Sequence, residues 1–357
     1  MIKYKIGDIA EEISIRENDP ANCSYDKFVG LEHYVSGDVE IHNYGSTEKL
    51  SSAMKAFQAG DILIARRNVY LRRASVVNFD GLTSGDSIVL RVKDEILAKI
   101  LPFVLNSDSF WDFADQYSDG TMSKRLSPKM LKQFEFELPD KEEQEKYAKL
   151  LWAAYRTKRS YEKLLVKIDE LVKSQFIEMF GDTENNPRKL EMKAWKDIFE
   201  TTTGKLDSNA MVDGGEYPFF TCAKEAYWID KYAFDCEALL LAGNNAVGVY
   251  DVKYYNGKFN AYQRTYVLQL KEKGWSYEFF KNQLEMKLDY LRENSIGSNT
   301  RYLTLKILGD IKFLVPDIEN QREWADFIRQ TDKSKFEIKQ AIDSLNATIR
   351  ALVQKNS

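Results

Sequence analysis

Apolar residues recur at heptad spacing through the middle of the chain. They are Tyr147, Leu151, Ala154, Tyr161, Leu165, Ile168 and Val172. This spacing is typical of a helix that packs lengthwise against another helix, although Lys158 interrupts the stripe. Asp140, with Glu143 three residues later, predicts the helix start through a capping box, and Gly181 predicts its end. At 1.5 Å per residue, residues 141–180 would span about 60 Å, so the stripe needs a long partner.

A second amphipathic run near the C-terminus supplies that partner. Its apolar positions form two adjacent stripes, Ile328, Ile342 and Ile349 on one and Ile338, Leu345 and Leu352 on the other. A parallel pairing of the two runs would need a long return connection after Gly181, and the sequence provides none. We therefore expect the two helices to pair antiparallel as a coiled coil.

The second half of the chain repeats the first. Nine residues recur 177 positions later: Ser118, Gly120, Leu126, Leu131, Phe136, Pro139, Asp140, Gln144 and Ala148 become Ser295, Gly297, Leu303, Leu308, Phe313, Pro316, Asp317, Gln321 and Ala325. Upstream, residues 61–64 parallel residues 237–240, and Val89-Leu90 parallels Val267-Leu268. A nearly constant offset indicates a duplicated unit, a globular domain followed by a long helix.

The residues between the helices predict mixed α/β domains. Apolar runs at 62–65 and 238–242 predict buried strands, and 96–106 and 109–117 predict short helices. We expect an α+β fold with an internal pseudo-twofold repeat, in which two globular domains lie at opposite ends of the paired helices. The expected boundaries are 1–139 for the first domain, 140–181 for the central helix, 182–315 for the second domain and 316–357 for the C-terminal helix.

The composition is that of a globular protein without a membrane span. Hydrophobic residues make up 44% of the 357 residues and charged residues 30%, and no apolar run reaches the length of a membrane helix. The N-terminus lacks the apolar centre of a signal peptide. Cys23, Cys222 and Cys236 form no CxxC pair, and His33 and His42 are the only histidines. We therefore expect a cytoplasmic protein without disulfides, metal or cofactor.

Basic residues gather in segments that lack acidic residues, although the net charge is −4. Two such segments lie in the first half and two at similar places in the second half. Their basic residues are Arg66, Arg67, Arg72 and Arg73; Lys124, Arg125, Lys129 and Lys132; Lys253, Lys258 and Arg264; and Arg301 and Lys306. Residues 257–266 are also dense in amides, arginine and tyrosine, the side chains that read base edges or stack on bases. An ordinary hairpin with a tyrosine-rich face remains open for this segment.

Motifs for catalysis are missing. The sequence has no G-x-S-x-G nucleophile elbow, no Walker A loop and no G-x-G-x-x-G. Glu337-x-Lys339, with Asp317, superficially resembles a nuclease arrangement, but it falls on the predicted C-terminal helix, where residues two apart point to different faces. Asn185-Asn186-Pro187-Arg188 lacks the aromatic residue of an adenine-flipping motif. We interpret the chain as non-catalytic.

The order of these features resembles the specificity (S) subunit of type I restriction–modification systems over essentially the whole chain. The resemblance is carried by residues 57–64, by Gly120-Thr121 with Leu126 and Leu131, by the two Pro-Asp helix starts, and by residues 257–267. It implies that the two globular domains are target-recognition domains, each reading one half of a bipartite, asymmetric DNA site. It also implies that the helices act as a spacer and bind two adenine methyltransferase (M) subunits, with restriction (R) subunits joining in a larger complex.

On this reading, double-stranded DNA is the ligand and the basic and amide side chains of the two domains contact it. The candidates are Arg66, Arg67, Asn68, Arg72, Arg73, Lys124, Arg125, Lys205, Asn244, Asn245, Lys258, Asn260, Tyr262, Gln263, Arg264, Asn299 and Arg301. Different residues at matching places, Arg66-Arg67-Asn68 against Ala242-Gly243-Asn244, predict different half-sites. The alternatives are a coiled-coil adaptor that joins protein-binding domains without reading DNA, and a stand-alone nuclease or methyltransferase.

Overall fold

The computed structural model describes residues 1–120, 123–246 and 248–354. The chain divides into two compact units, unit 1 from Met1–Lys163 with Lys339–Ser357, and unit 2 from Leu164–Ile338. Each long helix, α5 (Lys141–Phe180) and α10 (Ile318–Gln354), contributes one part to each unit. Both units contain sheets and helices, which confirms the expected α+β class.

Unit 1 contains two larger sheets and a two-stranded ribbon. The four-stranded sheet has the order β2 (Ala10–Ile13), β10 (Ser87–Val92), β7 (Ile62–Ala65), β8 (Ala74–Val76). The five-stranded sheet has the order β3 (Ile15–Glu17), β6 (Met54–Phe57), β9 (Gly81–Thr83), β4 (Lys27–Val29), β5 (Gly45–Ser46). The ribbon pairs β1 (Ile2–Lys5) with β11 (Glu135–Leu138).

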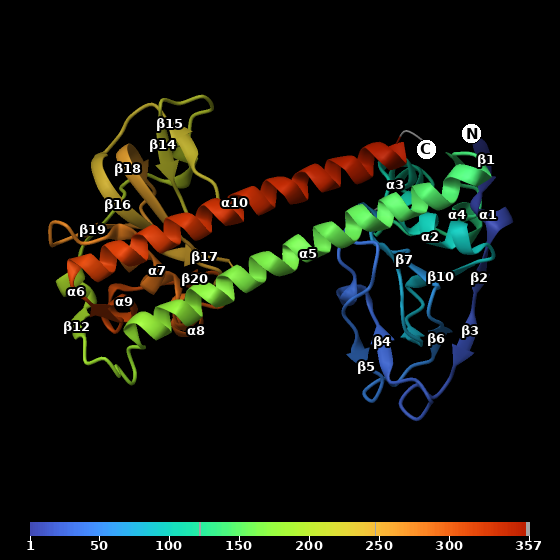
Figure 1. Ribbon diagram of the computed structural model, residues 1–357, viewed down its shortest axis with the longest axis horizontal. Helices are drawn as coiled ribbons and strands as arrows, with labels where there is room; N and C mark the ends of the chain where they lie inside the picture. The colour runs from blue at the N-terminus through green and yellow to red at the C-terminus, as the bar shows by residue number, and fades with distance from the viewer. Residues whose placement is uncertain (121–122, 247, 355–357) are drawn as a thin grey trace. The chain divides into compact units, whose positions relative to one another are not determined.

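The α-helices of unit 1 gather at one end of α5. They are α1 (Ile6–Ile9), α2 (Glu95–Val104), α3 (Asp108–Gln116) and α4 (Pro128–Leu131). Helices α2, α3 and α4 lie beside the first turns of α5, and strands β3 to β6 extend away from it (Figure 1). The two predicted helices at 96–106 and 109–117 are therefore confirmed as α2 and α3, within two residues at each end.

Strand β7 reads as a continuous apolar run because both of its faces are buried. Ile62 and Ile64 belong to the core that α2 and α5 cover. Leu63 belongs to a second, smaller core on the other face, with Val29 and Phe57. A strand covered on both faces cannot alternate apolar and polar residues, so its sequence signal is a run and not a period of two.

Unit 2 contains a six-stranded sheet and two ribbons. The sheet order is β13 (Phe199–Thr203), β19 (Thr265–Leu270), β16 (Phe234–Ala242), β18 (Val252–Ala261), β14 (Tyr217–Phe220), β15 (Tyr227–Ile229). The ribbons pair β12 (Glu191–Ala194) with β21 (Lys312–Val315) and β17 (Asn244–Asn245) with β20 (Arg301–Tyr302). The helices are α6 (Trp195–Ile198), α7 (Tyr277–Glu285), α8 (Leu288–Asn294) and α9 (Leu305–Gly309). Strand β16, like β7, separates two cores: Leu239 and Leu241 face one, and Leu240 faces the other.

The internal repeat is visible in the strand registers of the two units. Ala65 of β7 pairs with Ser87 of β10, and Ala242 of β16 pairs with Thr265 of β19. The offset is not constant along the chain, however: β1 begins at residue 2 and β12 at residue 191, so the first strands lie 189 positions apart. Unit 1 has a longer segment between its second strand and its central strand, and the predicted offset near 177 therefore holds only from β7 onward.

The two long helices contact each other inside each unit. In unit 2, Lys335 pairs with Asp169 at 2.6 Å, and the Trp324 ring lies 5.3 Å from that of Phe176. Earlier residues of α10 thus meet later residues of α5, which is an antiparallel arrangement within this unit. In unit 1 the Tyr147 hydroxyl donates to the carbonyl oxygen of Leu352 at 3.0 Å. A coiled coil along the full length of both helices stays a prediction.

Both ends of α5 lie where the sequence predicted them, but only the C-terminal end has the predicted capping pattern. Gly181 has a φ of 79° and its amide donates to the Ile177 carbonyl at 2.8 Å, as expected of a left-handed stop. At the other end, the Asp140 carboxylate accepts from the Met1 amino group at 3.3 Å, and the Glu143 amide bonds to the Asp140 carbonyl at 2.8 Å instead. The predicted capping box at Asp140 is therefore wrong.

Candidate nucleic-acid interface

In unit 1, backbone pairing joins two of the basic segments that lie far apart in the sequence. The Asn68 amide donates to the Lys124 carbonyl, and the Leu126 amide donates to the Arg66 carbonyl, both at 2.9 Å. The end of strand β7 therefore lies beside the basic loop that precedes α4. Strand pairing places Arg67 opposite Arg125 in this arrangement.

The basic loop itself is closed by reciprocal hydrogen bonds. Asp119 and Arg125 exchange backbone bonds of 3.0 and 2.9 Å, with Gly120 at a φ of 99° between them. Such a φ is accessible to glycine but strained for other residues, which explains a glycine at this place. Thr121 and Met122 of the same loop lie outside the described residues.

Unit 2 contains the same framework. Ile296 and Tyr302 exchange backbone bonds of 3.1 and 2.8 Å, and Gly297 has a φ of 110°. The Leu303 amide donates to the Gly243 carbonyl at 2.8 Å, as Leu126 does to Arg66 in unit 1. Each unit thus holds a strand end against a glycine-containing loop.

This framework corrects the expected match between the strand ends. Arg67 pairs with Arg125, and Asn244 pairs with Tyr302. Arg66-Arg67-Asn68 is therefore equivalent to Gly243-Asn244-Asn245, not to Ala242-Gly243-Asn244. The expected alignment was wrong by one residue, because the sequence around 242–245 carries no feature that fixes the register of a two-residue strand. Val247, which follows this strand, lies outside the described residues.

The equivalence extends to the strand that lies on the other side. The Arg66 amide donates to the Asp86 carbonyl at 2.9 Å, and the Gly243 amide donates to the Arg264 carbonyl at 2.7 Å. Asp86 and Arg264 therefore occupy the same position in the two units and carry opposite charges.

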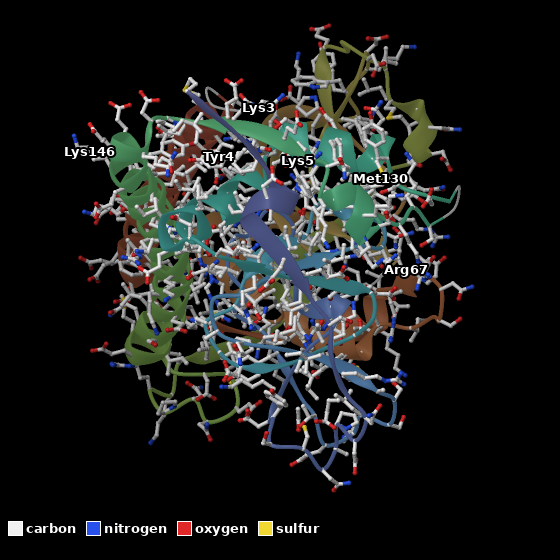
Figure 2. All side chains as sticks on the ribbon, turned by 90° about the vertical axis from the view of Figure 1, so that its right-hand side faces the viewer. Lys3, Tyr4, Lys5, Arg67, Met130 and Lys146 are labelled. Atoms are coloured by element: carbon white, nitrogen blue, oxygen red, sulfur yellow. The ribbon has the colours of Figure 1, made fainter. Side chains whose placement is uncertain are left out.

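In unit 1, Asp86 lies between two arginines. Its carboxylate oxygens are 3.8 Å from the Arg67 guanidinium and 3.6 Å from that of Arg125, and all three side chains are 31–51% exposed. Ser123 accepts from Arg67 Nε at 3.0 Å and donates to Asn68 at 3.1 Å. In Figure 2, Arg67 lies well apart from Lys3 and Lys5 of β1, so these basic residues form no common patch.

The other basic candidates of unit 1 have partners within the protein. Arg73 donates to the carbonyl oxygens of Leu31 and Arg67, both at 3.0 Å, and burial lowers its pKa. Lys124 pairs with Asp115 at 2.7 Å. Arg66 is half-buried, and its Nε has no hydrogen-bond partner within the described residues.

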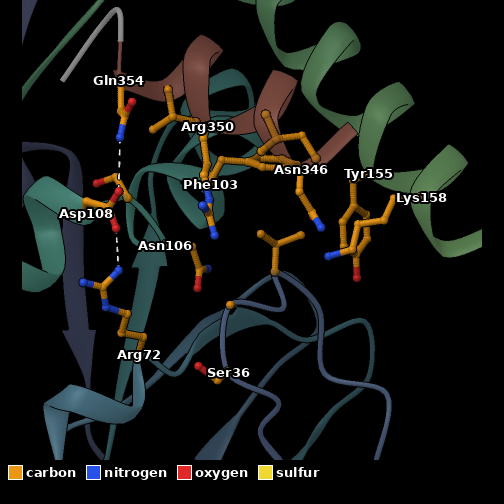
Figure 3. Close-up of a pocket in the computed structure, with 15 residues that line it drawn as sticks. Ser36, Arg72, Phe103, Asn106, Asp108, Tyr155, Lys158, Asn346, Arg350 and Gln354 are labelled. Carbon is orange, nitrogen blue, oxygen red and sulfur yellow. Dashed lines mark hydrogen bonds and ion pairs between the residues drawn. The ribbon is translucent and has the colours of Figure 1, made fainter. Parts of the chain in front are cut away.

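Arg72 lies at a different place, a cavity of about 310 Å³ inside unit 1. Its guanidinium pairs with Asp108, whose other oxygen accepts from Gln354 at 3.1 Å (Figure 3). Arg72 thus connects a turn of the domain to α3 and to the last turn of α10. This arrangement indicates a structural contact and separates Arg72 from the Arg67 group.

In unit 2, the equivalent surface is polar and aromatic. The Arg264 guanidinium lies 5.8 Å from the centre of the Tyr302 ring, a distance at which a cation is attracted to the ring face. Asn244 Oδ1 accepts from the Cys222 thiol at 2.7 Å, and burial raises the pKa of that thiol. Arg264 and Tyr302 line a cavity of about 470 Å³.

Most of the remaining candidates of unit 2 surround this surface. Gln263 donates to Asp207 at 3.3 Å, Arg301 donates to the Ser295 carbonyl at 3.0 Å, and Asn245 accepts from the Val249 amide at 3.3 Å. Three further candidates, two of them exposed, lie in the neighbouring loops: Lys205, Tyr262 and Asn299.

Two candidates of β18 do not belong to this surface. Asn260 is 4% exposed, and its amide group bonds to the Lys231 carbonyl at 2.9 Å, so its expected role as a DNA contact does not fit this structure. The Lys258 ammonium lies 4.6 Å from the Tyr232 ring centre. Residues 257–266 thus comprise the end of β18, a turn and the start of β19, and the turn and the start of β19 lie at the framework.

The sequence interpretation missed residues that the framework brings in. Asp86 was missed because the search was for segments without acidic residues. Ser123 and Tyr302 were also missed, although Tyr302 is 37% exposed. Matching Asp86 with Arg264 through the repeat would have been the available signal.

In the part of the chain that the structure describes, no group of three or more histidine, cysteine, aspartate or glutamate side chains could hold a metal ion. No helix there is both long and apolar enough to cross a membrane.

Comparison with known proteins defines the class first. Residues 187–346 match the family model described as the type I restriction modification DNA specificity domain. This range contains the loop framework of unit 2, so the second half of the chain carries a domain of that class. The fold of the whole chain resembles the crystal structure of the S subunit of a type I restriction–modification system from M. genitalium, with a TM-score of 0.61 and 16% identity over 99% of this chain and 95% of that one.

Curated relatives agree with this class. The chain is 37% identical over 151 residues to the specificity subunit of the type I restriction enzyme EcoDI from Escherichia coli, a match that covers 40% of this chain and 32% of the relative. A putative type I specificity subunit of Mycoplasma pneumoniae is 28% identical over 222 residues, covering 58% and 79% of the two chains. Residues 187–346 of this chain thus match the type I specificity domain, and the chain is similar to type I restriction–modification specificity subunits. The match spans only about a third of the length of the Escherichia coli relative.

Proposed function

We propose that the chain is a non-catalytic DNA-reading subunit whose two units each recognise one half of a bipartite, asymmetric site. The observation that carries this proposal is the shared framework with different side chains. Arg67, Arg125 and Asp86 in unit 1 correspond to Asn244, Tyr302 and Arg264 in unit 2. Because base pairs are distinguished by their donors and acceptors, one framework with different side chains reads different sequences.

The proposal includes the partners that the family implies. The sequence-specific subunit directs two adenine methyltransferase subunits to the site, and restriction subunits join the complex. The paired helices α5 and α10 hold the two recognition domains at a fixed separation, so the spacing between half-sites follows from protein geometry. Residues 1–139 and 182–315 are the proposed target-recognition domains. Within each unit, a contact between α5 and α10 supports the pairing of the two helices there.

Mapping of methylated adenines in cells that carry this chain and its methyltransferase partner tests the proposal. We expect a two-part motif with a constant spacer. Arg67→Ala and Arg264→Ala should each relax one part of the motif, at a cost of roughly 1–3 kcal/mol if the lost contact is bidentate. An adaptor without DNA reading predicts no motif and no salt-dependent DNA binding when the methyltransferase is present. An unchanged motif with both arginines replaced would refute the site assignment.

A further inference from the structure

The opposite charges at one framework position carry a further inference about what each unit reads. The Asp86 carbonyl oxygen accepts from the amide of Arg66, the residue after strand β7. The Arg264 carbonyl oxygen accepts from the amide of Gly243, the residue after strand β16. Their side chains therefore leave the two frameworks at the same point. An acceptor stands at this point in unit 1 and a donor stands there in unit 2.

We propose that Asp86 is a base-reading residue, which accepts a hydrogen bond from the amino group of cytosine while a flanking arginine binds the guanine of the same pair. This inference rests on the proposed DNA-reading function. Arg264, at the equivalent point of unit 2, supplies donors to guanine and no acceptor. At this one position, unit 1 thus offers a hydrogen-bond acceptor to the base and unit 2 offers donors.

The geometry around Asp86 differs from that of a structural ion pair in the same unit. Asp61 is 2% exposed and accepts two hydrogen bonds of 2.8 Å from Arg91, which holds both side chains in place. Asp86 is 31% exposed, and its arginines lie at 3.6 and 3.8 Å, beyond hydrogen-bonding distance. Within residues 1–120, 123–246 and 248–354, the Asp86 carboxylate has these two ion pairs but accepts no hydrogen bond, so it can still accept one from a ligand.

The negative charge of Asp86 favours a base over a phosphate as the ligand at this position. A phosphate bound by Arg67 and Arg125 would bring its negative charge against the Asp86 carboxylate, which would weaken the contact. The edge of a G·C pair in the major groove carries no such charge. It presents two acceptors on guanine and one amino donor on cytosine, and a guanidinium beside a carboxylate supplies the complementary donors and acceptor.

The test compares the sequences that variants of the chain retain from a pool of random DNA duplexes. The full-length chain is purified from cells together with the subunits it retains, and bound duplexes are sequenced. Asp86→Ala removes the acceptor, and Asp86→Asn keeps the shape but adds a donor. Asp115→Asn is the matched control, because Asp115 is an exposed acid of the same unit that pairs with Lys124. Far-UV circular dichroism checks that each variant is folded. If Asp86→Ala does not fold, the test uses Asp86→Asn alone.

The expected result is a two-part motif for the wild type, in which both Asp86 variants lose a G·C preference at one position of one part. A loss of roughly tenfold at that position corresponds to one specific base contact, and Asp115→Asn should retain the wild-type motif. A uniform loss of binding with the motif unchanged would mean that Asp86 only orients the arginines, and the inference would be wrong. A wild type that enriches no motif at all would instead refute the proposed function.

Discussion

Gly297→Ala is the substitution that tests the loop framework most directly. Gly297 has a φ of 110°, and a Cβ atom added there would lie 2.1 Å from the Thr300 carbonyl oxygen. Real Cβ atoms do not approach backbone oxygen this closely, so the loop backbone must move. The same loop carries Arg301 and Tyr302, and we expect their positions to be lost with it.

The expected loss of stability follows from the strain that the new side chain causes and from the hydrogen bonds that the loop loses if it opens. A side chain at this φ costs about 1–3 kcal/mol, and forcing an extra methyl group into a packed site costs a further 1–3 kcal/mol. The two backbone bonds between Ile296 and Tyr302 contribute only about 1 kcal/mol each. Opening the loop therefore relieves more strain energy than the two lost hydrogen bonds contribute to stability. Unit 2 should stay folded, with its free energy of unfolding lowered by about 2 kcal/mol.

Hydrogen exchange and urea unfolding measure the two expected effects. In Gly297→Ala, the amides of Ile296 and Tyr302 should lose their protection, while Val267, which pairs with Leu240 in the sheet, should keep its own. Urea unfolding should show the lower stability. In the methylation assay, only the part of the motif read by unit 2 should weaken.

Gly309→Ala is the matched control in the same unit. A Cβ atom at Gly309 meets no atom within 4 Å, and the residue ends helix α9, so no destabilisation is expected. Gly120→Ala in unit 1 should have a smaller effect than Gly297→Ala, because its Cβ would lie 3.2 Å from the Ser123 carbonyl oxygen. Protected Ile296 and Tyr302 amides in Gly297→Ala, together with a stability equal to that of Gly309→Ala, would refute this reasoning.

Three further changes have defined outcomes. Asp61→Asn leaves a buried amide against the Arg91 guanidinium and should lower the free energy of unfolding by about 3 kcal/mol in urea titration; a loss below about 1 kcal/mol would contradict the assigned ion pair. The Asn320 backbone amide holds the pKa of Asp317 below its ordinary value, so this helix cap stabilises above that ordinary value and is lost as pH falls through the lowered pKa. Amide exchange at Asn320 should therefore rise as pH falls below the ordinary pKa of an aspartate, and an Asp317→Ala variant should lack that transition. Deletion of one heptad from residues 141–180 should change the tolerated spacer between the half-sites or abolish assembly. An unchanged spacer would refute the proposal that the helices set the distance between the half-sites.

Long-range periodicity made the long helices and the repeat predictable. A heptad stripe such as that of Leu151 and Val172 forms only where a helix has an apolar partner along its length, so the pattern alone indicates both helix and partner. The burial of the residues in the stripe agrees with this pattern only in part. Leu151 and Val172 are buried within their own units, while Leu165 and Ile168 are only half-buried. The buried strands were predictable for a similar reason, because a strand covered on both faces must be apolar throughout.

The candidate site was predictable only in part. Composition drew attention to Arg67, Arg125 and Arg264, because basic side chains outside a core are free to bind anions or bases. It could not separate Arg72, which is engaged by Asp108, or Asn260, which is buried. Whether a polar side chain is available depends on its neighbours, and those neighbours come from other parts of the chain.

The sequence by itself determined the α+β class, the two long helices, the duplicated unit and the family resemblance, since each depends on patterns that are repeated many times along the chain. Only the tertiary structure decided that Asp86 lies between Arg67 and Arg125, and that Arg264 takes its place in unit 2. Such a meeting depends on the register of a few backbone hydrogen bonds between distant segments. A shift of one residue would exchange one side chain for the next, and no repeated pattern in the sequence fixes it.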